Sequence, residues 1–405
     1  MTSVCHYGAW PRLRRLGHNT ICPGCMCNVM KSDVDVSVVI GTRPELIKLA
    51  PVIRALRQLN DRTRVVLSGQ HRELVDQLLP DLEIVPDVDL EVMRRGQSLN
   101  QLCARLFTAL HAELSAHRPR RVIVQGDTTT AMVTTLAAFH AGIPVGHVEA
   151  GLRSHRLNNP FPEEANRQLV GRLARWHFAP TRAAASNLTL EGVPDHSVWV
   201  TGNTVIDNLA WVLGRGLGQS QFPAATGRRK VLLTLHRRES QGSVMLALAR
   251  TLGELAHTLE LDVVVPVHPS PGVRSSLLPE FEGRPNVIIR PPLDYLDFVA
   301  TMADCHFVIT DSGGVQEEAP WLGKPVLVCR ETTERAEAIN EGVARLIGTR
   351  PADLRASVTE LCQDPTLYAT MSRRVSPYGD GRAAERITQV LFAPDRPQVV
   401  CTAAL

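Results

Sequence analysis

Apolar, β-branched runs that end in glycine or polar residues and lead into helical patterns recur along this chain. Residues 122–124 form such a run, and a Gly-Asp pair and an alanine-rich helical pattern follow it, closed by Gly142. A second run at 145–148 comes next. Short apolar runs that alternate with helices are typical of buried parallel strands joined by helical crossovers. The pattern therefore predicts an α/β protein built on parallel sheet.

The strand–helix pattern occurs in two successive blocks. Between them, residues 214–229 are rich in Gly, Gln, Ser, Pro and Arg with little periodicity, as expected of an exposed connection. The first block contains predicted strands at 34–40, 64–67, 122–124, 145–148, 176–179 and 198–200. The second block contains predicted strands at 230–235, 262–267, 287–289, 307–310 and 325–329.

Two blocks in a chain of 405 residues indicate two domains, because one hydrophobic core rarely grows to this size. We predict two doubly wound, Rossmann-like domains that face a central cleft. The predicted parts are an extension over 1–32, an N-terminal domain over 33–205, a C-terminal domain over 206–377, and a helix at about 378–393 that joins the N-terminal domain.

The charge balance argues against polyanionic partners. The chain carries 44 Lys and Arg against 41 Asp and Glu, a formal net charge of +3. No long basic run interleaved with aromatic residues is present, so we expect no nucleic-acid partner. No apolar stretch approaches the length that crosses a bilayer, so we expect no membrane partner.

Cysteine usage indicates a reducing compartment and no metal. Five of the nine cysteines are scattered singly, which favours reduced thiols in a cytoplasmic protein: Cys103, Cys305, Cys329, Cys362 and Cys401. The other four lie within the first 30 residues, where Cys22-Pro-Gly-Cys25-Met-Cys27 resembles half a zinc site without a second pair. We therefore predict no metal site.

The first 30 residues contain no recognisable packed element. Arginines are present there, but no apolar run follows them, so we expect no signal peptide. We predict either a disordered extension or translation that starts at Met30, just before the first strand.

Three acidic residues follow strand ends or open a helix in the first block. Asp127 and Glu149 come directly after predicted strands, and Glu163 begins a helix after a proline-rich loop. Because parallel strands end at one edge of a sheet, we expect these acids to share a crevice with Arg153 and Arg167. Acids beside cations fit acid–base work on a phosphorylated substrate. Alternatively, Asp127 caps a helix and Glu163 complements a helix dipole.

Turns after other strands favour phosphate binding. The turn that follows the first strand, 41–45, opens a helix but is not GxGxxG, which disfavours a dinucleotide. In the second block, residues 312–314 (Ser-Gly-Gly) leave backbone N–H groups exposed at a helix start. His236 precedes two arginines at a strand end, which favours a ligand role over that of a satisfied structural histidine.

A series of segments, in the same order, resembles the non-hydrolysing UDP-N-acetylglucosamine 2-epimerases. The resemblance extends from about residue 36 to 390 and rests on GTRPELIKLAP, SGQHRELVDQ, VQGDTTTAMV, HVEAGLRS, PFPEEANRQLV, TGNTVIDNL, LTLHRRES, PLDYLDF, TDSGGVQEEAPWLGKPVLV, RETTERAEA and SPYGDGRA. It implies a two-domain glycosyltransferase-B fold, a UDP-sugar substrate, no cofactor, a homodimer, and a second UDP-N-acetylglucosamine molecule as activator.

The resemblance also implies roles for individual residues. Catalytic positions of the family match Asp127, Glu149, Glu163, His236 and Lys48. Substrate-binding positions match Arg43, Arg167, Phe298, Ser312, Gly313, Gly314, Glu318 and Arg335. Positions that contact the activator match Gln70, His71, Arg237 and His268. Phe298 also fits a core position, because its segment has helical apolar spacing.

The chain departs from the family pattern in a few places. Residues 270–272 (Ser-Pro-Gly) stand where an Asn-Pro pair is usual, close to His268, and Ala336 replaces a usual proline. The first 30 residues have no counterpart in the family.

The implied reaction is reversible epimerisation at C2 of UDP-N-acetylglucosamine, through elimination of UDP to a glycal and its re-addition. A hydrolysing 2-epimerase, a glycosyltransferase of the same fold and a non-catalytic sugar-nucleotide sensor are the alternatives, because a fold and a nucleotide site do not by themselves define a reaction.

Overall fold

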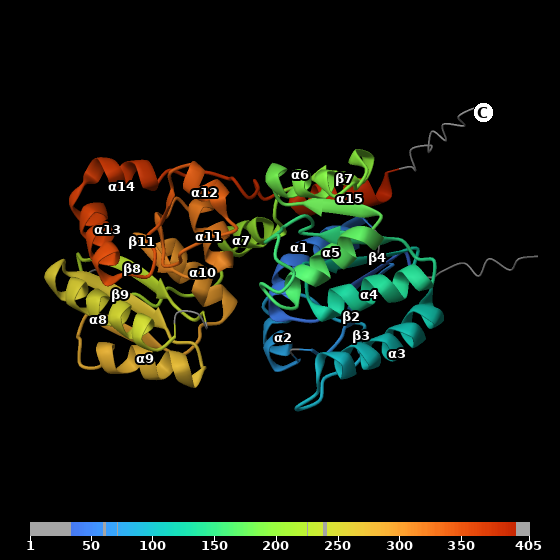
Figure 1. Cartoon of the computed structure of the whole chain (residues 1–405), viewed down its shortest axis with the longest axis horizontal. Helices are drawn as coiled ribbons and strands as arrows, with labels where there is room; N and C mark the ends of the chain where they lie inside the picture. Colours follow the sequence, from blue (N-terminus) through green and yellow to red (C-terminus); the bar gives the residue numbers. More distant parts are fainter. Residues whose placement is uncertain (1–33, 60–61, 71, 225, 238–240, 394–405) are drawn as a thin grey trace, which may run out of the picture.

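The computed structural model describes residues 34–59, 62–70, 72–224, 226–237 and 241–393 (Figure 1). Two parallel sheets occupy the two halves of the molecule, with helix α7 (Thr204–Gly214) between them. The predictions about the extension over 1–32, translation from Met30 and the amino-terminal cysteines fall outside the described residues.

The first sheet contains seven parallel strands among the described residues, in the order β3-β2-β1-β4-β5-β6-β7. Its strands are β1 (Val36–Ile40), β2 (Thr63–Leu67), β3 (Val88–Asp89), β4 (Arg121–Gln125), β5 (Val145–Val148), β6 (Trp176–Ala179) and β7 (Val198–Val200). Besides α7, its helices are α1 (Arg43–Leu59), α2 (Arg72–Leu78), α3 (Leu99–His117), α4 (Thr129–His140), α5 (Glu163–Leu173), α6 (Arg182–Leu190) and the 3₁₀ helix η1 (Asp195–Ser197).

The second sheet contains six parallel strands in the described part of the chain, in the order β10-β9-β8-β11-β12-β13. Its strands are β8 (Arg229–Thr234), β9 (Leu261–Pro266), β10 (Val287–Arg290), β11 (Phe307–Thr310), β12 (Val326–Val328) and β13 (Ala344–Leu346). The remaining helices are α8 (Ser243–Thr258), α9 (Pro271–Phe281), α10 (Tyr295–Asp304), α11 (Gly313–Trp321), α12 (Ala336–Asn340), α13 (Pro351–Gln363), α14 (Pro365–Met371) and α15 (Ala383–Phe392).

The central strands of both sheets are buried along their length. Every residue of β1, β5 and β11 is buried, because helices cover both faces of a parallel sheet. The predicted strands at 145–148, 176–179, 198–200 and 307–310 match the observed bounds, and the other predicted strands differ by one or two residues at their ends. The predicted α/β fold class is confirmed.

The strand order of each sheet reverses beside its first strand. In the first sheet β1 pairs with β2 on one side and with β4 on the other, and in the second sheet β8 pairs with β9 and β11. The helices that follow such neighbouring strands lie on opposite faces, so their loops diverge and leave room for a ligand. The loops after β1, β4, β8 and β11 are therefore the first place to look for a site.

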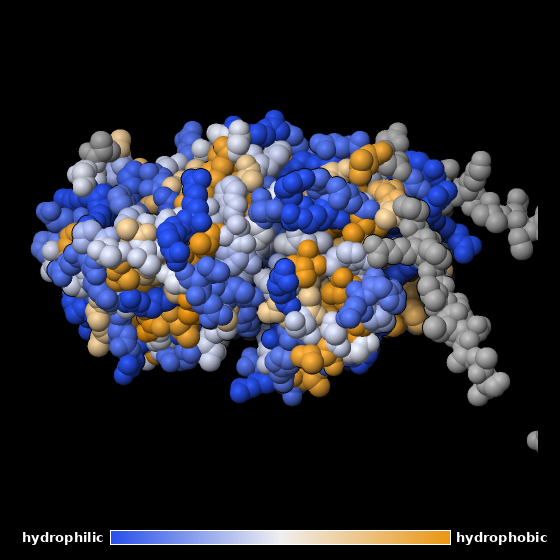
Figure 2. Space-filling model, turned by 90° about the horizontal axis from the view of Figure 1, so that it is seen from above, coloured by the Kyte–Doolittle hydropathy of each residue, from blue (hydrophilic) through white to orange (hydrophobic). Residues whose placement is uncertain are grey.

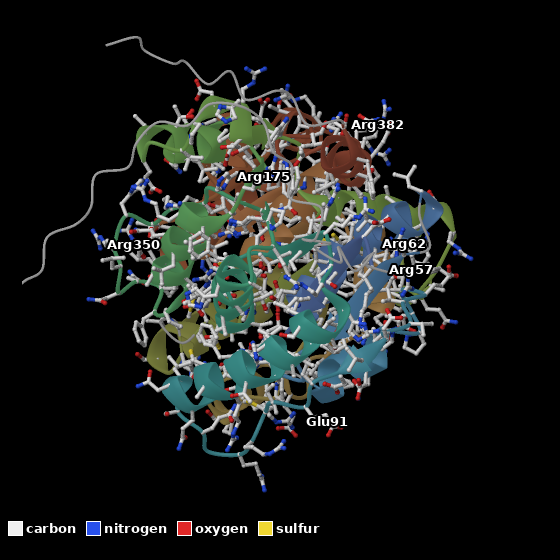
Figure 3. The ribbon with its side chains drawn as sticks, turned by 90° about the vertical axis from the view of Figure 1, so that its right-hand side faces the viewer. Arg57, Arg62, Glu91, Arg175, Arg350 and Arg382 are labelled. Carbon is white, nitrogen blue, oxygen red and sulfur yellow. The ribbon has the colours of Figure 1, made fainter. Side chains whose placement is uncertain are left out.

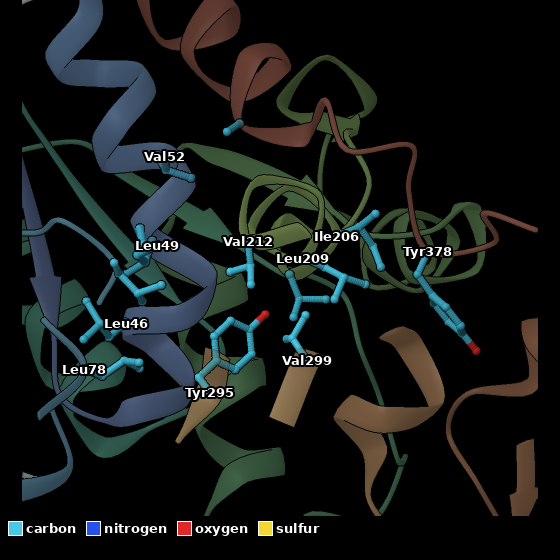
Figure 4. Close-up of a cluster of buried hydrophobic side chains, with 14 of the residues drawn as sticks. Leu46, Leu49, Val52, Leu78, Ile206, Leu209, Val212, Tyr295, Val299 and Tyr378 are labelled. Atoms are coloured by element: carbon cyan, nitrogen blue, oxygen red, sulfur yellow. The ribbon is translucent and has the colours of Figure 1, made fainter. Parts of the chain in front are cut away.

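Helix α7 belongs to a hydrophobic core that reaches into both halves. Leu209 and Val212 of α7 lie in one buried cluster with Leu49 of α1 and with Tyr295 and Val299 of α10 (Figure 4). Helix α7 packs against α1 of the first half and against α10 and α11 of the second. One continuous apolar cluster therefore connects the two halves.

Helix α15, close to the carboxyl end of the chain, lies with the first half of the molecule (Figure 1). It packs against α1 and α7. The buried carboxylate of Asp207, on α7, accepts hydrogen bonds from the backbone N–H groups of Ala383 (3.2 Å) and Ala384 (2.7 Å). A side chain from another helix thus binds the otherwise unpaired N–H groups that open α15.

Charged side chains such as Glu91, Arg350 and Arg382 lie on the outside of the molecule (Figure 3). Apolar side chains appear there in small groups among hydrophilic ones (Figure 2). Of the helices in the described ranges, none combines the length and apolar character that crossing a membrane requires.

Candidate functional site

Helix α1, the residue that follows β5 and helix α11 bring a buried group of charges together. Lys48, on α1, forms an ion pair with Glu149, which directly follows β5. The Nζ atom of Lys48 also lies 3.7 Å from a carboxylate oxygen of Glu317, on α11 of the second half. All three side chains are largely buried, at 14%, 7% and 3% exposure. The two halves therefore share one ionic cluster.

Glu149 is held on several sides. Its carboxylate accepts a hydrogen bond from the side-chain amide of Gln125, on β4, and another of 3.1 Å from that of Asn203. Burial alone would raise the pKa of Glu149, but the charge and hydrogen bond of Lys48, with the charge of Arg335 and the hydrogen bond from Asn203, together outweigh burial and lower that pKa. The backbone at Glu149 has a φ of 63°, a conformation that non-glycine residues adopt at some cost and that is found at functional sites.

Asp127 is the second carboxylate at this edge of the sheet. It accepts hydrogen bonds from Arg167, on α5, at 2.8 Å from Nε and 2.7 Å from the terminal nitrogen. Burial raises the pKa of Asp127, Arg167 opposes this, and the charges of Glu149 and Glu163 add to the increase. The hydroxyl of Thr128 caps α4, so the interpretation of Asp127 as that helix's cap is wrong.

Glu163 and Arg153 are placed differently. Glu163 lies in the first turn of α5 and is half-buried, so a helix-dipole role stays compatible with its position. The buried carboxylate of Glu164, the next residue, accepts hydrogen bonds from Arg167 (3.1 Å) and from the N–H of Ser154 (2.9 Å). The expectation that Arg153 lies beside the acids is wrong, because its guanidinium pairs with Glu191 at 2.7 Å.

The second half contributes an arginine and a glycine turn. Arg335 donates a hydrogen bond of 3.0 Å to Glu317 and one of 3.2 Å to Glu334. Ser312 precedes α11, and its hydroxyl makes no capping bond to that helix. A Cβ atom added at Gly313 would lie 2.9 Å from the guanidinium carbon of Arg335, so a larger residue at 313 would require the Arg335 side chain to shift.

Other predicted substrate-binding residues of the second half lie on α10 and α11. Glu318 is buried and accepts a hydrogen bond of 3.2 Å from the hydroxyl of Tyr295. Burial, together with the charge of Glu317, raises the pKa of Glu318 to about 7. Phe298 is half-buried and packs against the shared core, as its apolar spacing also predicts. Gly314 lies in the first turn of α11.

His236 follows β8 and adjoins Asp311. The buried carboxylate of Asp311 accepts hydrogen bonds from the backbone N–H groups of His236 (2.9 Å) and Arg237 (2.9 Å). The imidazole of His236 is 41% exposed, and its ring stacks on that of His268 with centroids 5.8 Å apart. Burial lowers the pKa of His236. A partly exposed imidazole on a fixed backbone remains available to a ligand.

The remaining predicted residues lie near the loop after β1. The guanidinium of Arg43 donates to the carbonyl of Leu293 in the second half at 3.4 Å, and burial lowers its pKa. Gln70 accepts a hydrogen bond of 2.8 Å from the hydroxyl of Thr130. His71 lies outside the described residues.

The sequence alone did not identify four polar residues that line this region. Asn203 and Glu317 bind the Lys48–Glu149 pair, Glu334 binds Arg335, and Glu45 is buried beside the first turn. All four residues fall within segments that carry the family resemblance. The segments therefore indicated the region of the site, but not which of their side chains contact one another.

No group of three or more His, Cys, Asp or Glu side chains with the geometry of a metal site occurs in the described ranges. A surface groove of about 510 Å³ lies elsewhere between the halves, and its lining includes Thr181, Arg182, Glu337, Asp380 and Arg386. None of the predicted site residues within the described ranges lines it. The ionic cluster, rather than this groove, is therefore the candidate site.

The family model for UDP-N-acetylglucosamine 2-epimerase matches residues 54–392 of this chain. The curated UDP-N-acetylglucosamine 2-epimerases of Yersinia pestis and Salmonella typhimurium are 46% and 47% identical to it over 367 residues, which cover 88% of this chain and 98% of each relative. The chain belongs to the UDP-N-acetylglucosamine 2-epimerase family. The resemblance inferred from its motifs is thereby confirmed.

Solved structures of the epimerase family share the architecture. The Neisseria meningitidis UDP-GlcNAc 2-epimerase bound to UDP-GlcNAc matches with a TM-score of 0.83 at 41% identity, over 89% of this chain and 100% of that one. The Methanocaldococcus jannaschii UDP-GlcNAc 2-epimerase in complex with UDP-GlcNAc and UDP matches with a TM-score of 0.74 at 29% identity, over 88% and 99%.

Proposed function

We propose that this protein interconverts UDP-N-acetylglucosamine and UDP-N-acetylmannosamine by epimerisation at C2 of the sugar. Its similarity to curated and solved UDP-N-acetylglucosamine 2-epimerases over nearly their whole length supports this activity. The observation that carries the proposal is the charge cluster in which Glu149 pairs with Lys48 and lies within electrostatic range of Asp127, the two carboxylates following adjacent strands.

The chemistry requires a leaving group, because the C2 proton of the sugar is not next to a carbonyl. Cleavage of the bond between C1 and the diphosphate oxygen gives C1 the character of an oxocarbenium ion, which acidifies the C2–H. A carboxylate takes that proton, which leaves a glycal and UDP. When UDP adds back at C1 and a proton returns to C2 on the opposite face, the epimer forms.

Asp127, Glu149 and Glu163 are the proposed acid–base groups. Burial raises the pKa of Asp127, whereas the groups around Glu149, Lys48 foremost, together outweigh burial and lower the pKa of Glu149. Two carboxylates with different proton affinities fit an exchange that uses an acid and a base on opposite faces of one ring. Arg167 orients Asp127 through two bonds from the same guanidinium group.

Positive groups from both halves are proposed to bind the diphosphate. Lys48 and Arg43 come from the first half, and Arg335 and His236 come from the second. The N–H groups of Gly313 and Gly314, at the start of α11, add a helix N-terminus that favours an anion, whereas the N–H of Ser312 already donates to the hydroxyl of Thr310. Groups that bind the departing UDP more strongly as its charge develops lower the barrier to elimination.

The test is incubation with UDP-N-acetylglucosamine in D₂O, followed by NMR. We expect UDP-N-acetylmannosamine with deuterium at C2, and deuterium at C2 of the recovered substrate. Free N-acetylmannosamine would instead identify a hydrolysing epimerase. A spectrum without exchange would refute the proposed reaction.

A pair of variants identifies the acids in the same assay. Asp127→Asn should slow exchange at C2 by roughly 10²–10⁴-fold, the usual contribution of an acid–base group. Glu282→Gln, at an exposed residue after α9, removes a carboxylate of the surface and should retain the wild-type rate. Equal rates for the two variants would exclude Asp127 from the reaction.

The homodimer, the cytoplasmic location and a second UDP-N-acetylglucosamine molecule as activator stay predictions. Gln70, Arg237 and His268 are the described residues proposed to contact the activator. The ring of His268 stacks on that of His236. This contact supports the proposal that an activator bound at His268 would affect His236 and, through it, the binding of the diphosphate.

A further inference from the structure

Glu317 is a carboxylate of the second half that contacts three polar groups at the junction between the halves. One oxygen accepts a hydrogen bond of 3.0 Å from Nε of Arg335. The other accepts a bond of 3.1 Å from the amide of Asn203 and lies 3.7 Å from Nζ of Lys48. Its side chain is 3% exposed, so these contacts replace water almost completely.

The groups around Glu317 are the ones that a diphosphate requires. Lys48 comes from α1 in the first half, and Arg335 precedes α12 in the second. Both are proposed above to bind the diphosphate. Without an acid between them, two buried cations at this spacing repel each other. Consistent with this proximity, burial lowers the pKa of Lys48, Glu149 and Glu317 raise it by more, and Arg335 lowers it.

We propose that Glu317 is a positioning residue that holds Lys48 and Arg335 side by side, so that the two cations from opposite halves form one binding site for the diphosphate of the substrate. This inference rests on the proposed function. It assigns Glu317 no contact with the sugar and no proton transfer. The residue acts through the two cations, and through Asn203 it fixes their place relative to Glu149.

The neighbouring acids do not duplicate this role. Glu334 binds Arg335 and Arg330 but has no contact with Lys48 among those that the structure describes. Glu318 accepts a hydrogen bond from Tyr295 and, among the contacts that the structure describes, has none with Arg335. Glu149 binds Lys48 and Asn203 but belongs to the first half. Glu317 therefore joins a cation of each half through one carboxylate.

The test compares Glu317→Gln with Glu334→Gln for UDP affinity by calorimetry and for UDP-N-acetylglucosamine turnover. Each variant removes one negative charge beside Arg335. If Glu317 positions the cations, E317Q should raise the Kd for UDP and the KM for the sugar nucleotide about tenfold, and kcat should fall by a smaller factor. E334Q should raise both constants by a clearly smaller factor.

The competing explanation predicts the opposite change in UDP affinity. A carboxylate that only competes with the diphosphate for the cations would make E317Q bind UDP more tightly than the wild type. Unchanged or tighter UDP binding by folded E317Q would overturn the inference, and so would equal losses in E317Q and E334Q.

Two further measurements distinguish failure of this inference from misfolding of E317Q and from failure of the proposed function. If E317Q does not fold, Glu317→Asp keeps the charge but is one methylene shorter and cannot reach both cations, so its UDP affinity should fall as well. Wild-type affinity in E317D would overturn the inference. Absence of C2 exchange in the wild-type protein would refute the proposed function, whereas loss of UDP affinity in the variant reports on Glu317 alone.

Discussion

At the scale of single residues, Glu45 shows how much of this site depends on burial. It lies in the first turn of α1, where an acid normally faces water and complements the helix dipole. Here it is 1% exposed and accepts hydrogen bonds from the N–H of Gly41 (3.0 Å) and the hydroxyl of Thr128 (2.7 Å). Glu45 therefore joins the loop after β1, which leads into Arg43, to the loop after β4, which carries Asp127.

Glu45 should make stability depend on pH. Burial raises its pKa from the ordinary 4.5 to about 7, although hydrogen bonds from Thr128, Thr42 and Gly41 oppose the increase. Between these two values the folded chain keeps a proton that the unfolded chain has released. The contribution of Glu45 is therefore fully present below about 4.5 and is lost as pH rises through 7.

Between pH 4.5 and pH 8, we expect the free energy of unfolding of the wild type to fall, relative to that of Glu45→Gln, by on the order of 3 kcal/mol. Urea unfolding at several pH values measures it, with Glu282→Gln as the control for a carboxylate in water. A difference that stays constant with pH would show that Glu45 does not titrate in this range.

The sequence was sufficient to locate Asp127 and Glu149 after strand ends, because strand ends follow from apolar runs and their polar successors. It was insufficient for the direction of individual side chains. Arg153 is close to Glu149 in sequence, yet it pairs with Glu191. Glu317 and Asn203 bind Lys48 and Glu149 through contacts between distant segments, for which one sequence contains no periodic signal.

At the scale of elements, most strands were predictable, including the three-residue β7, whereas β3 and β13 were not. Strand β3 (Val-Asp) and strand β13 (Ala-Arg-Leu) contain no run of β-branched apolar residues, so in the sequence neither differs from a loop. Likewise, an alanine-rich helix after the Gly-Asp pair was predicted, but only the structure shows that Thr128 is the cap of this helix, α4.

Helix α15 begins on a side chain of another element, and this attachment can be tested. Asp207→Ala removes the acceptor for the N–H groups of Ala383 and Ala384. Because buried donors without partners are costly, we expect a loss of about 1–3 kcal/mol and faster amide exchange in α15. Hydrogen–deuterium exchange with mass spectrometry localises the effect.

The matched control is Asp364→Ala, which removes the acceptor that caps α14 through Thr366 and Leu367. It should accelerate exchange in α14 and leave α15 unchanged. Unaltered exchange of α15 in the Asp207 variant would show that packing against α1, rather than Asp207, holds this helix.

At the scale of the whole molecule, the two halves meet through an apolar core and an ionic cluster together. The core around α7 continues from α1 to α10, and the cluster joins α1 to α11. The fold of each half was predictable from its own strands. Their relative placement was not, because it depends on contacts such as Arg43 with Leu293 that no local pattern marks.

Ligands that engage both halves should stabilise the folded chain. UDP at a hundredfold excess over its Kd should raise the free energy of unfolding by about 2.7 kcal/mol. Uridine at the same concentration lacks the diphosphate and should stabilise less. Thermal unfolding measures both effects. Lys48→Met should reduce the difference between the stabilisation by UDP and the stabilisation by uridine. Equal stabilisation by uridine and UDP would argue that the cations do not bind the diphosphate.

Asn203 stands on the segment that crosses from one half to the other, and its single amide group donates to the carboxylates of Glu149 and Glu317 at 3.1 Å each. Any swing of one half against the other must stretch at least one of these bonds. Donation from Asn203 favours the ionised form of Glu149. The proton affinity of Glu149 therefore depends on how the two halves are placed relative to each other. Substitutions in the apolar core around α7, which joins the two halves, would therefore change the proton affinity of Glu149 without contacting it.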